Sequence, residues 1–480
     1  MRPLILLICL AASGSAIADA RYLGRWLGEA IAVHETIVIG LQIERDEAGA
    51  LQARFTQPVV NYFGVPLPGG ARAEGELLRL PDLGLELRLR GDRLEGVRSG
   101  ADMQIRYRLQ RADSLPEAPD PPVLPTAPEP RWQTRLHGQL WASPVAHGGR
   151  VFIGSSGGVV SALDGASGQL LWNRPLGAPV FAAVAVSDDA LFVASDDGLL
   201  HRLDPGDGSE SWRYEIGGAE VPRVLPHPAV FDWEWQAAVP LVSGDSVFLG
   251  AADGLFHAVA AADGQRRWRF DSGAAIRNGA AVAGERVLFG NAKGWLFALD
   301  RESGRELWRV DTGAKVDTTP IVVGDTVIVG NRGRGLIAYA LEDGSQRWRS
   351  SFWGSWVEST PVLHDGVLYV GGSDIRRVSA LDPASGKVLW RSDVFGWNFG
   401  TPLVVGDTLH IGAAGGAPYF IPHQASYSVL DRRDGRLLRR RPLADDGGHQ
   451  WGIVGSPLRV GDQVVVATLA GSVLAFPLEP

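Results

Sequence analysis

A short motif recurs along most of the chain and restricts what it can fold into. In Ser379–Trp390 an apolar segment leads to Asp382, a turn that contains Gly386, and a second apolar segment that ends on Trp390. An aspartate side chain can accept hydrogen bonds from backbone N–H groups across a turn, and glycine can adopt a positive φ. The motif therefore predicts two strands joined by a tight turn. Its last position is occupied by Trp172, Trp212, Trp268, Trp308, Trp348 and Trp390, and then by Arg439, where tryptophan is missing.

The spacing of the motif predicts a β-propeller. The motif returns about every 40 residues, and a period near 40 with four strands per repeat is typical of propeller blades. Repeats begin with a pair such as Thr360-Pro361 and contain a two-residue hairpin turn such as Asp365-Gly366. Counting gives eight blades over residues 131–480, with the missing outer strand of the last blade supplied by Arg131–Gln133. This pairing would close the ring and remove its edges; a seven-bladed ring is the alternative if one repeat is out of register.

The first 20 residues have the features of an export signal. Arg2 gives a positive start, Leu4–Ala12 is a short apolar core, and Ala16–Ala18 fits a cleavage site of small residues. Cys9, the single cysteine, follows a large apolar residue, which argues against a lipid anchor. No other apolar run approaches the length of about 18 residues that a membrane span needs. We therefore predict a signal peptide over residues 1–20 and a periplasmic or secreted protein.

Two further segments precede the repeats. Between residues 21 and 113 apolar and charged residues alternate, as around Leu85, Leu87 and Leu89, and this period of two is typical of half-buried antiparallel strands. The segment is similar to small lipocalin-like barrels, so we expect a small antiparallel β-barrel over residues 21–113. Residues 114–130 contain seven prolines, which favour an extended chain over a central strand. We expect this segment to be a semi-rigid linker.

Composition excludes several classes of function. The formal net charge of −8 argues against a general role in binding nucleic acid. After loss of the signal peptide the chain would have no cysteine, which excludes disulfides, cysteine-based zinc sites, cysteine nucleophiles and covalent haem attachment. The sequence contains no Gly-x-Ser-x-Gly elbow and no phosphate-binding loop. The loops of the propeller are therefore where we expect function to lie.

The pattern Ala-x-Asp-x-x-x-Gly-Lys-x-x-Trp over residues 380–390 matches the tryptophan-docking motif of pyrroloquinoline quinone (PQQ) dehydrogenases. More widely, the imperfect repeats over residues 131–478 resemble the PQQ-like repeat family. That family also contains BamB, the propeller subunit of the outer-membrane protein assembly machinery. The resemblance implies that the six motif tryptophans are structural and stack between neighbouring blades. It is specific for the fold and leaves the chemistry open, since the family includes both enzymes and scaffolds.

Two insertions and one alignment indicate where a ligand site could lie. Residues 216–238 and 414–427 lengthen loops that emerge on the same face of a propeller, and loops on a rigid scaffold often carry function. Equivalent positions in three successive blades are polar, whereas other blades mostly have apolar residues there. Residues near the ends of the second strands of these blades can be added to the polar positions. The candidate ligand-binding set is then Arg277, Asp317, Glu358, Asn291, Asn331 and Arg332. A polar sector beside an apolar one suits a small-ligand site, although a ring of mixed charge that only binds water would look the same.

We predict a non-enzymatic binding or scaffold protein that needs no cofactor and binds an envelope or secreted protein, or a small ligand. Aromatic anchors dominate many interfaces, and the expected exposed contact residues are Trp233, Trp235, Trp353, Trp356, Tyr419 and Phe420. The alternative is a quinoprotein dehydrogenase with PQQ and Ca²⁺, which Asp317, Glu358 and the two asparagines could hold by residue type. The chain lacks the adjacent cysteine pair of those enzymes, and the expected absence of a lipid anchor departs from the BamB pattern.

Overall fold

The computed structural model describes residues 20–32, 35–99, 104–119, 123–225, 234–333, 335–353, 355–416 and 421–478. Most of the predicted signal peptide lies outside the described residues, as do three of the expected contact residues, Trp233, Tyr419 and Phe420. Contacts divide the chain into two compact units, Met1–Pro122 and Val123–Pro480. In the described part of the chain, no helix is long and apolar enough to cross a membrane.

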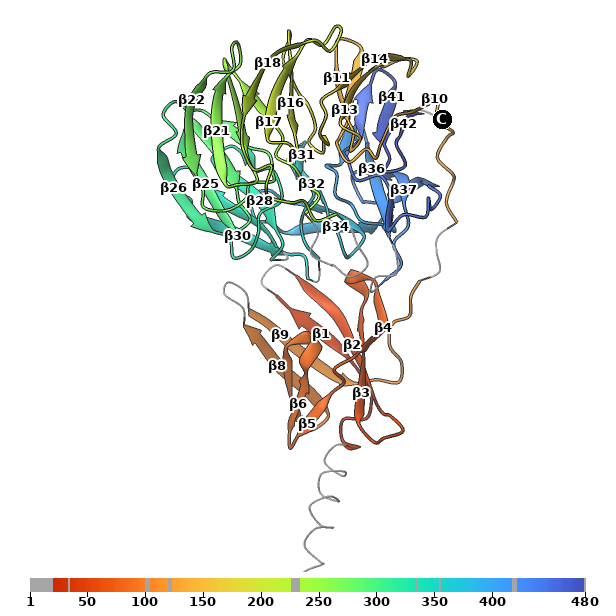
Figure 1. Ribbon diagram of the computed structural model, residues 1–480. Helices are drawn as coiled ribbons and strands as arrows, with labels where there is room; N and C mark the ends of the chain where they lie inside the picture. The colour runs from red at the N-terminus through yellow and green to blue at the C-terminus, as the bar shows by residue number, and fades with distance from the viewer. Residues whose placement is uncertain are drawn as a thin grey trace, which may run out of the picture. The chain divides into compact units, whose positions relative to one another are not determined.

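The first unit is a curled antiparallel sheet of nine strands in the order β4-β3-β2-β1-β9-β8-β7-β6-β5 (Figure 1). The strands are β1 (Gly24–Ile31), β2 (Thr36–Arg45), β3 (Leu51–Gln57), β4 (Tyr62–Leu67), β5 (Arg72–Glu74), β6 (Leu77–Leu80), β7 (Leu85–Arg90), β8 (Arg93–Ser99) and β9 (Gln104–Arg111). In β7 the three leucines are buried and the three charged residues between and after them are exposed. The alternation in the sequence therefore predicts this sheet correctly.

The second unit is a β-propeller of eight four-stranded antiparallel blades (Figure 1), as the repeat count predicts. Blades 1 to 7 run from β11 (Val145–His147) to β14 (Leu170–Pro175), β15 (Ala185–Val186) to β18 (Glu210–Glu215), β19 (Leu241–Ser243) to β22 (Arg266–Asp271), β23 (Ala281–Ala283) to β26 (Glu306–Asp311), β27 (Ile321–Val323) to β30 (Gln346–Ser351), β31 (Val362–His364) to β34 (Val388–Asp393) and β35 (Leu403–Val405) to β38 (Leu437–Pro442). An additional short strand, β39 (Gln450–Gly452), pairs with β36 (Thr408–Gly416) of blade 7.

Blade 8 joins the two ends of the propeller. Strands β40 (Leu458–Val460), β41 (Gln463–Ala467) and β42 (Ser472–Pro477) come from the end of the chain, and β10 (Trp132–Arg135) completes the sheet. In the β10–β42 ladder Trp132 lies opposite Ala475. The predicted closure of the ring by the segment around Trp132 is therefore confirmed: β10 pairs with the outer side of β42 and gives the last blade its fourth strand.

The segment expected to be a linker is attached to the propeller over its second half. The backbone N–H of Ala127 donates to the carbonyl of Arg440 (3.3 Å), and the N–H of Arg440 donates to the carbonyl of Pro125 (3.2 Å). The Arg441 guanidinium adds a hydrogen bond to the Ala127 carbonyl (2.7 Å). Residues 125–127 thus extend the outer edge of blade 7. Pro125 has no N–H to donate, and this pairing uses only its carbonyl.

An indole contact repeats between successive blades. The ring of Trp348, on β30, covers Gly386 of blade 6 so closely that a Cβ on Gly386 would lie 2.4 Å from Trp348 Cε3. The indole N–H of Trp348 donates to the carbonyl of Pro383 in the same turn (3.0 Å). The same pair of contacts is made at Trp172–Gly208, Trp212–Gly264, Trp268–Gly304, Trp308–Gly344 and Trp390–Gly435. Each contact fastens one blade to the next.

The blade junction without a motif tryptophan uses another aromatic pair. Where Arg439 replaces tryptophan, Tyr427 of blade 7 and Phe476 of blade 8 stack with ring centroids 4.3 Å apart. At the next junction, Trp132 of blade 8 packs on Gly168 of blade 1. All eight junctions therefore contain an aromatic ring from one blade or both.

Candidate functional site at the channel mouth

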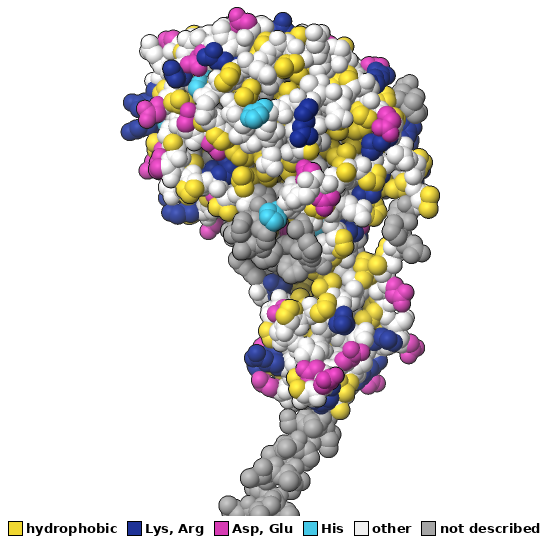
Figure 2. Space-filling model, turned by 45° about the vertical axis from the view of Figure 1, so that its right-hand side comes forward, with side chains coloured by type: hydrophobic (Ala, Val, Ile, Leu, Met, Phe, Trp, Pro, Cys, Tyr) yellow, Lys and Arg dark blue, Asp and Glu magenta, His cyan; other side chains and the backbone are white. Residues whose placement is uncertain are grey.

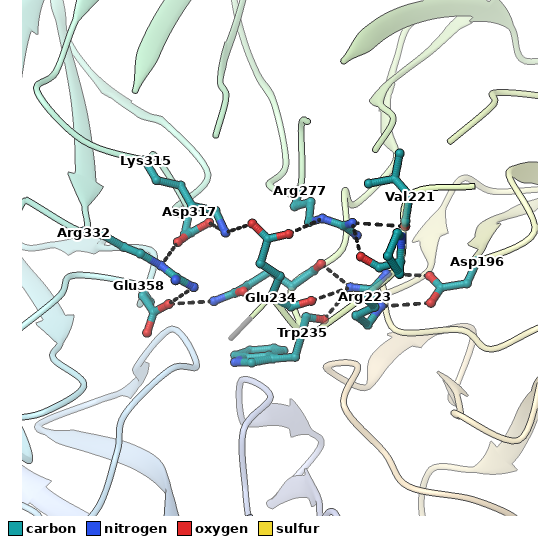
Figure 3. Close-up of polar contacts among 12 residues, drawn as sticks. Asp196, Val221, Arg223, Glu234, Trp235, Arg277, Lys315, Asp317, Arg332 and Glu358 are labelled. Atoms are coloured by element: carbon teal, nitrogen blue, oxygen red, sulfur yellow. Dashed lines mark hydrogen bonds and ion pairs between the residues drawn. The ribbon is translucent and has the colours of Figure 1, made fainter. Parts of the chain in front are cut away.

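The charged positions predicted from the repeats meet an insertion at one mouth of the central channel (Figure 3). The insertion between β18 and β19 folds back on itself, since the N–H of Glu234 donates to the carbonyl of Val224 (2.7 Å). This bridge places Glu234 and Gln236 against side chains of blades 4 to 6, and Trp235 against side chains of blades 1 and 7. We call these three residues the plug.

The plug completes a chain of ion pairs around the polar sector. Glu234 accepts from Lys315 Nζ (2.7 Å) and lies 3.3 Å from Arg277 Nε. Arg332 lies between two carboxylates, 2.5 Å from Asp317 and 3.0 Å from Glu358. The amide of Gln236 donates to Glu358 (2.9 Å). Four of the six residues predicted to bind a ligand are therefore brought together here, and their charges are matched by one another and by the plug.

Arg223 anchors the other side of the plug. Its guanidinium pairs with Asp196 (2.5 Å), donates to the carbonyls of Trp235 (2.8 Å) and Gln236, and lies 4.3 Å from the ring centroid of Phe181. The charge network comprises Asp196, Arg223, Glu234, Arg277, Lys315, Asp317, Arg332 and Glu358. With four basic and four acidic members, the network can balance its own charge in a partly dehydrated site.

The apolar sector of the mouth holds the ring of Trp235. Its centroid lies 5.7 Å from that of Trp141 and 5.4 Å from that of Phe399. Trp235 was expected to be exposed, and this expectation is wrong: the side chain is half-buried because it fills the gap between blades that present apolar residues to the channel. In the plug, Glu234 thus contacts the polar sector of the mouth, and the indole of Trp235 contacts the apolar sector.

The remaining predicted site residues are not members of the charge network. Asn291 and Asn331 are fully buried and donate to backbone carbonyls, of Ser272 (3.0 Å) and Thr312 (2.8 Å), so they do not join the charge network. Both act as braces for turns within the blades. Trp353 and Trp356 are half-buried rather than exposed, and the indole of Trp356 lies 4.4 Å under the Arg332 guanidinium.

Glu358 is the member of the network whose protonation is most perturbed. Burial raises the pKa of Glu358 to about 7, with Arg332 opposing the rise and Asp317 adding to it. For Glu234, burial acts in the same direction, but Lys315 and Arg277 outweigh it and lower the pKa. Near neutral pH the mouth therefore contains one carboxyl group that is poised between its neutral and charged forms.

This shift makes the stability of the propeller depend on pH. A carboxyl group whose pKa is higher in the folded than in the unfolded protein contributes its full stabilisation of the folded state at pH values below its unfolded pKa. That contribution is lost as the pH rises toward 7. Relative to the wild type, Glu358→Gln is therefore expected to gain about 2 kcal/mol of unfolding free energy between about pH 5 and about pH 8. Urea unfolding at both pH values measures this gain. Glu302→Gln, which removes an exposed carboxylate, is the control, and an equal gain in both variants would contradict the assignment.

The same contacts decide how well a calcium-bound quinone would fit. A calcium ion held by Asp317 and Glu358 would have to displace the guanidinium of Arg332 from both carboxylates. Asn291 and Asn331, the other ligands expected by residue type, have their amides bonded to the backbone. Among the described residues, no group of three or more His, Cys, Asp or Glu side chains could hold a metal ion. The donor set does not fit this cofactor pair.

Blade 2 contains a hydrogen-bonded serine, histidine and glutamate that no spacing in the sequence predicts. Ser195 Oγ lies 2.9 Å from His201 Nε2, and His201 Nδ1 lies 3.2 Å from Glu210 Oε2. Both Ser195 and His201 are buried, and Ser195 bonds the carbonyl four residues on, as Ser155 does at the same place in blade 1. In blade 1 the equivalent serine is present, but Ser161 replaces the histidine. We therefore interpret the three side chains of blade 2 as stabilising a turn rather than as activating a nucleophile.

Eight blades fastened by recurring tryptophan–glycine contacts define the second unit as a propeller of PQQ-like repeats. A family model described as "Outer membrane protein assembly factor BamB" matches residues 125–256, 252–355 and 338–479. These segments span every blade. The chain belongs to this family.

Individual relatives are more distant. The outer membrane protein assembly factor BamB of Burkholderia pseudomallei (strain K96243) is 34% identical over 116 residues, which are 24% of this chain and 27% of that protein. The matched region thus spans about a quarter of that protein's length.

Solved structures share the fold at low sequence identity. BamB from Moraxella catarrhalis superimposes with a TM-score of 0.57 and 18% identity, covering 73% of this chain and 97% of that chain. The quinohemoprotein alcohol dehydrogenase from Comamonas testosteroni gives a TM-score of 0.56 and 14% identity, covering 73% of this chain and 76% of that chain. One neighbour is an assembly factor and the other an enzyme, so this likeness concerns the fold alone.

Proposed function

We propose that this protein is an exported, non-enzymatic scaffold of the cell envelope that binds another protein through the loop face of its propeller. Export rests on the apolar segment that follows Arg2. The scaffold role rests on one observation: each of the four acidic side chains of the charge network is paired with a basic side chain of the insertion or of a blade. A mouth whose charged side chains are already paired with one another is better suited to holding a fixed shape than to binding a metal ion.

Membership of the BamB family favours a protein partner over other macromolecules, since relatives carry the name of an outer membrane protein assembly factor. The surface charge is compatible with this choice. Figure 2 shows basic and acidic side chains interspersed among the described residues of the propeller face in view, rather than gathered by sign. An interspersed surface suits contact with a protein better than with a polyanion.

Site-specific photo-crosslinking in the native envelope tests the proposal. Lys293 is exposed in the turn between β24 (Arg286–Gly290) and β25 (Trp295–Asp300), on the face of the insertions, whereas Asp325 lies in a turn at the opposite end of the strands. A photoreactive residue at Lys293 is expected to give one dominant protein adduct, and the matched residue at Asp325 is expected to give none. Equal adducts at both positions would contradict the assignment of the face. Saturable binding of PQQ and Ca²⁺ that is lost in Glu358→Ala would instead support a dehydrogenase.

A further inference from the structure

The channel contains a cavity of about 280 Å³ beside the plug. One side of it is aromatic and includes Trp141, Phe181, Trp235 and Phe399, whose neighbouring ring centroids are 5.4 to 6.0 Å apart. Taking about 30 Å³ per water, this volume corresponds to about nine waters or to a ligand of roughly ten non-hydrogen atoms. The cavity is therefore large enough for a small molecule.

The lining of the cavity also includes two amide side chains whose oxygens lack a hydrogen-bond donor. The Gln236 amide nitrogen donates to Glu358 and the Asn278 amide nitrogen donates to the carbonyl of Val316 (2.7 Å), so both amides are fixed in orientation. Their oxygens have no hydrogen-bond donor among the described residues, although the two side chains are 8% and 4% exposed. A buried acceptor without a donor costs about 1–3 kcal/mol. A ligand that brings hydroxyl groups would remove that cost.

Hydroxyl groups in the same cavity supply donors. Thr319 Oγ1 accepts from the N–H of Gly279 (3.2 Å), and Thr360 Oγ1 accepts from the N–H of Thr319 (3.1 Å). Ser143 Oγ likewise accepts from the N–H of Ser456 (2.8 Å). Each of these hydroxyls keeps its own hydrogen, which has no acceptor in the described part of the chain. The cavity thus offers both acceptors and donors to a ligand that has both.

Charge selects among possible ligands. Arg277 and Asp317, one of each sign, both line the cavity, and the surrounding charge network balances itself. A cationic or anionic ligand would therefore meet one repulsive partner, whereas a neutral ligand would meet none. Flat aromatic side chains suit the apolar C–H face of a saturated ring. We propose that the cavity binds a neutral, polyhydroxylated ring compound of monosaccharide size, independently of any protein partner on the loop face.

Titration of the full protein with D-glucose, D-galactose and D-mannose tests this proposal. We expect at least one sugar to give saturable heat in calorimetry and a saturable change in tryptophan fluorescence. Ala183→Leu adds volume inside the cavity without removing a polar contact, and it is expected to weaken binding at least about tenfold. Trp141→Ala is expected to do the same by removing an aromatic wall.

Trp295→Ala is the matched control, because this half-buried tryptophan on β25 lies outside the cavity and contacts Arg309. It is expected to leave the sugar affinity unchanged, and far-ultraviolet circular dichroism would establish that all three variants are folded. Absence of saturable binding for every sugar would overturn the proposal. Unchanged affinity in folded Ala183→Leu would also overturn it, since binding would then lie elsewhere. Neither result would alter the crosslinking expected on the loop face.

Discussion

Replacing Arg332 with methionine is expected to lower the unfolding free energy of the propeller by about 3–5 kcal/mol, the usual cost of removing one partner from a buried ion pair. The Arg332 side chain is 7% exposed, and its two carboxylate partners, on Asp317 and Glu358, are 0% and 4% exposed. Methionine keeps much of the packing against Trp356 but supplies no charge. Urea or thermal unfolding, monitored by tryptophan fluorescence, measures the loss.

Arg347→Met in the same blade provides the control. Arg347 also makes a close ion pair, 2.5 Å from Asp325, but the two side chains are 36% and 80% exposed. Exposed pairs contribute about 0–1 kcal/mol, so this variant should lose little. If Arg332→Met and Arg347→Met cost the same, burial of the charge network would not be the source of its contribution.

The propeller could be predicted because each repeat encodes its own strands and turns. Asp382, Gly386 and Trp390 act within one blade and its neighbour, so their spacing in sequence translates directly into the blade count. The closure by β10 followed from the missing fourth strand of the last repeat. Neither inference required knowledge of how distant loops pack.

The site could be predicted only in part, for the same reason. Arg277, Asp317 and Glu358 occupy equivalent positions in three blades, and the symmetry of the repeats brings them to one mouth. The partners Glu234 and Trp235 come from an insertion, which has no counterpart in other blades to indicate its path. No local pattern predicts that such a loop returns to the channel.

The two asparagines illustrate a different error. Asn291 stands where strand two ends, and its side-chain oxygen accepts from the backbone N–H groups of Lys293 (3.1 Å) and Trp295 (3.0 Å) instead of facing the channel. Ser155 and Thr468 occupy the corresponding turns of other blades and bond the carbonyl four residues on. A small polar residue at the same place in several repeats was the available signal for a structural role.

Gly386→Ala is expected to destabilise the propeller by about 3–5 kcal/mol, because the new methyl group meets an indole as well as an unfavourable backbone conformation. Gly386 has a φ of +71°, and a Cβ there would lie 2.4 Å from Trp348 Cε3 and 2.8 Å from Cδ2. The indole cannot retreat without losing its hydrogen bond to the carbonyl of Pro383. Chemical unfolding measures the loss, and near-ultraviolet circular dichroism should report a displaced tryptophan.

Gly366→Ala separates the two causes. Gly366 has a φ of +74°, close to that of Gly386, but a Cβ there would have no described atom within 4 Å. Its cost should therefore be only the backbone penalty of about 1–2 kcal/mol. If the blades are fastened by the ring of Trp348, combining Gly386→Ala with Trp348→Ala must cost less than the sum of the two single changes, since the clash disappears with the indole. Strict additivity, or equal losses at Gly366 and Gly386, would mean that the indole does not hold the junction between blades 5 and 6.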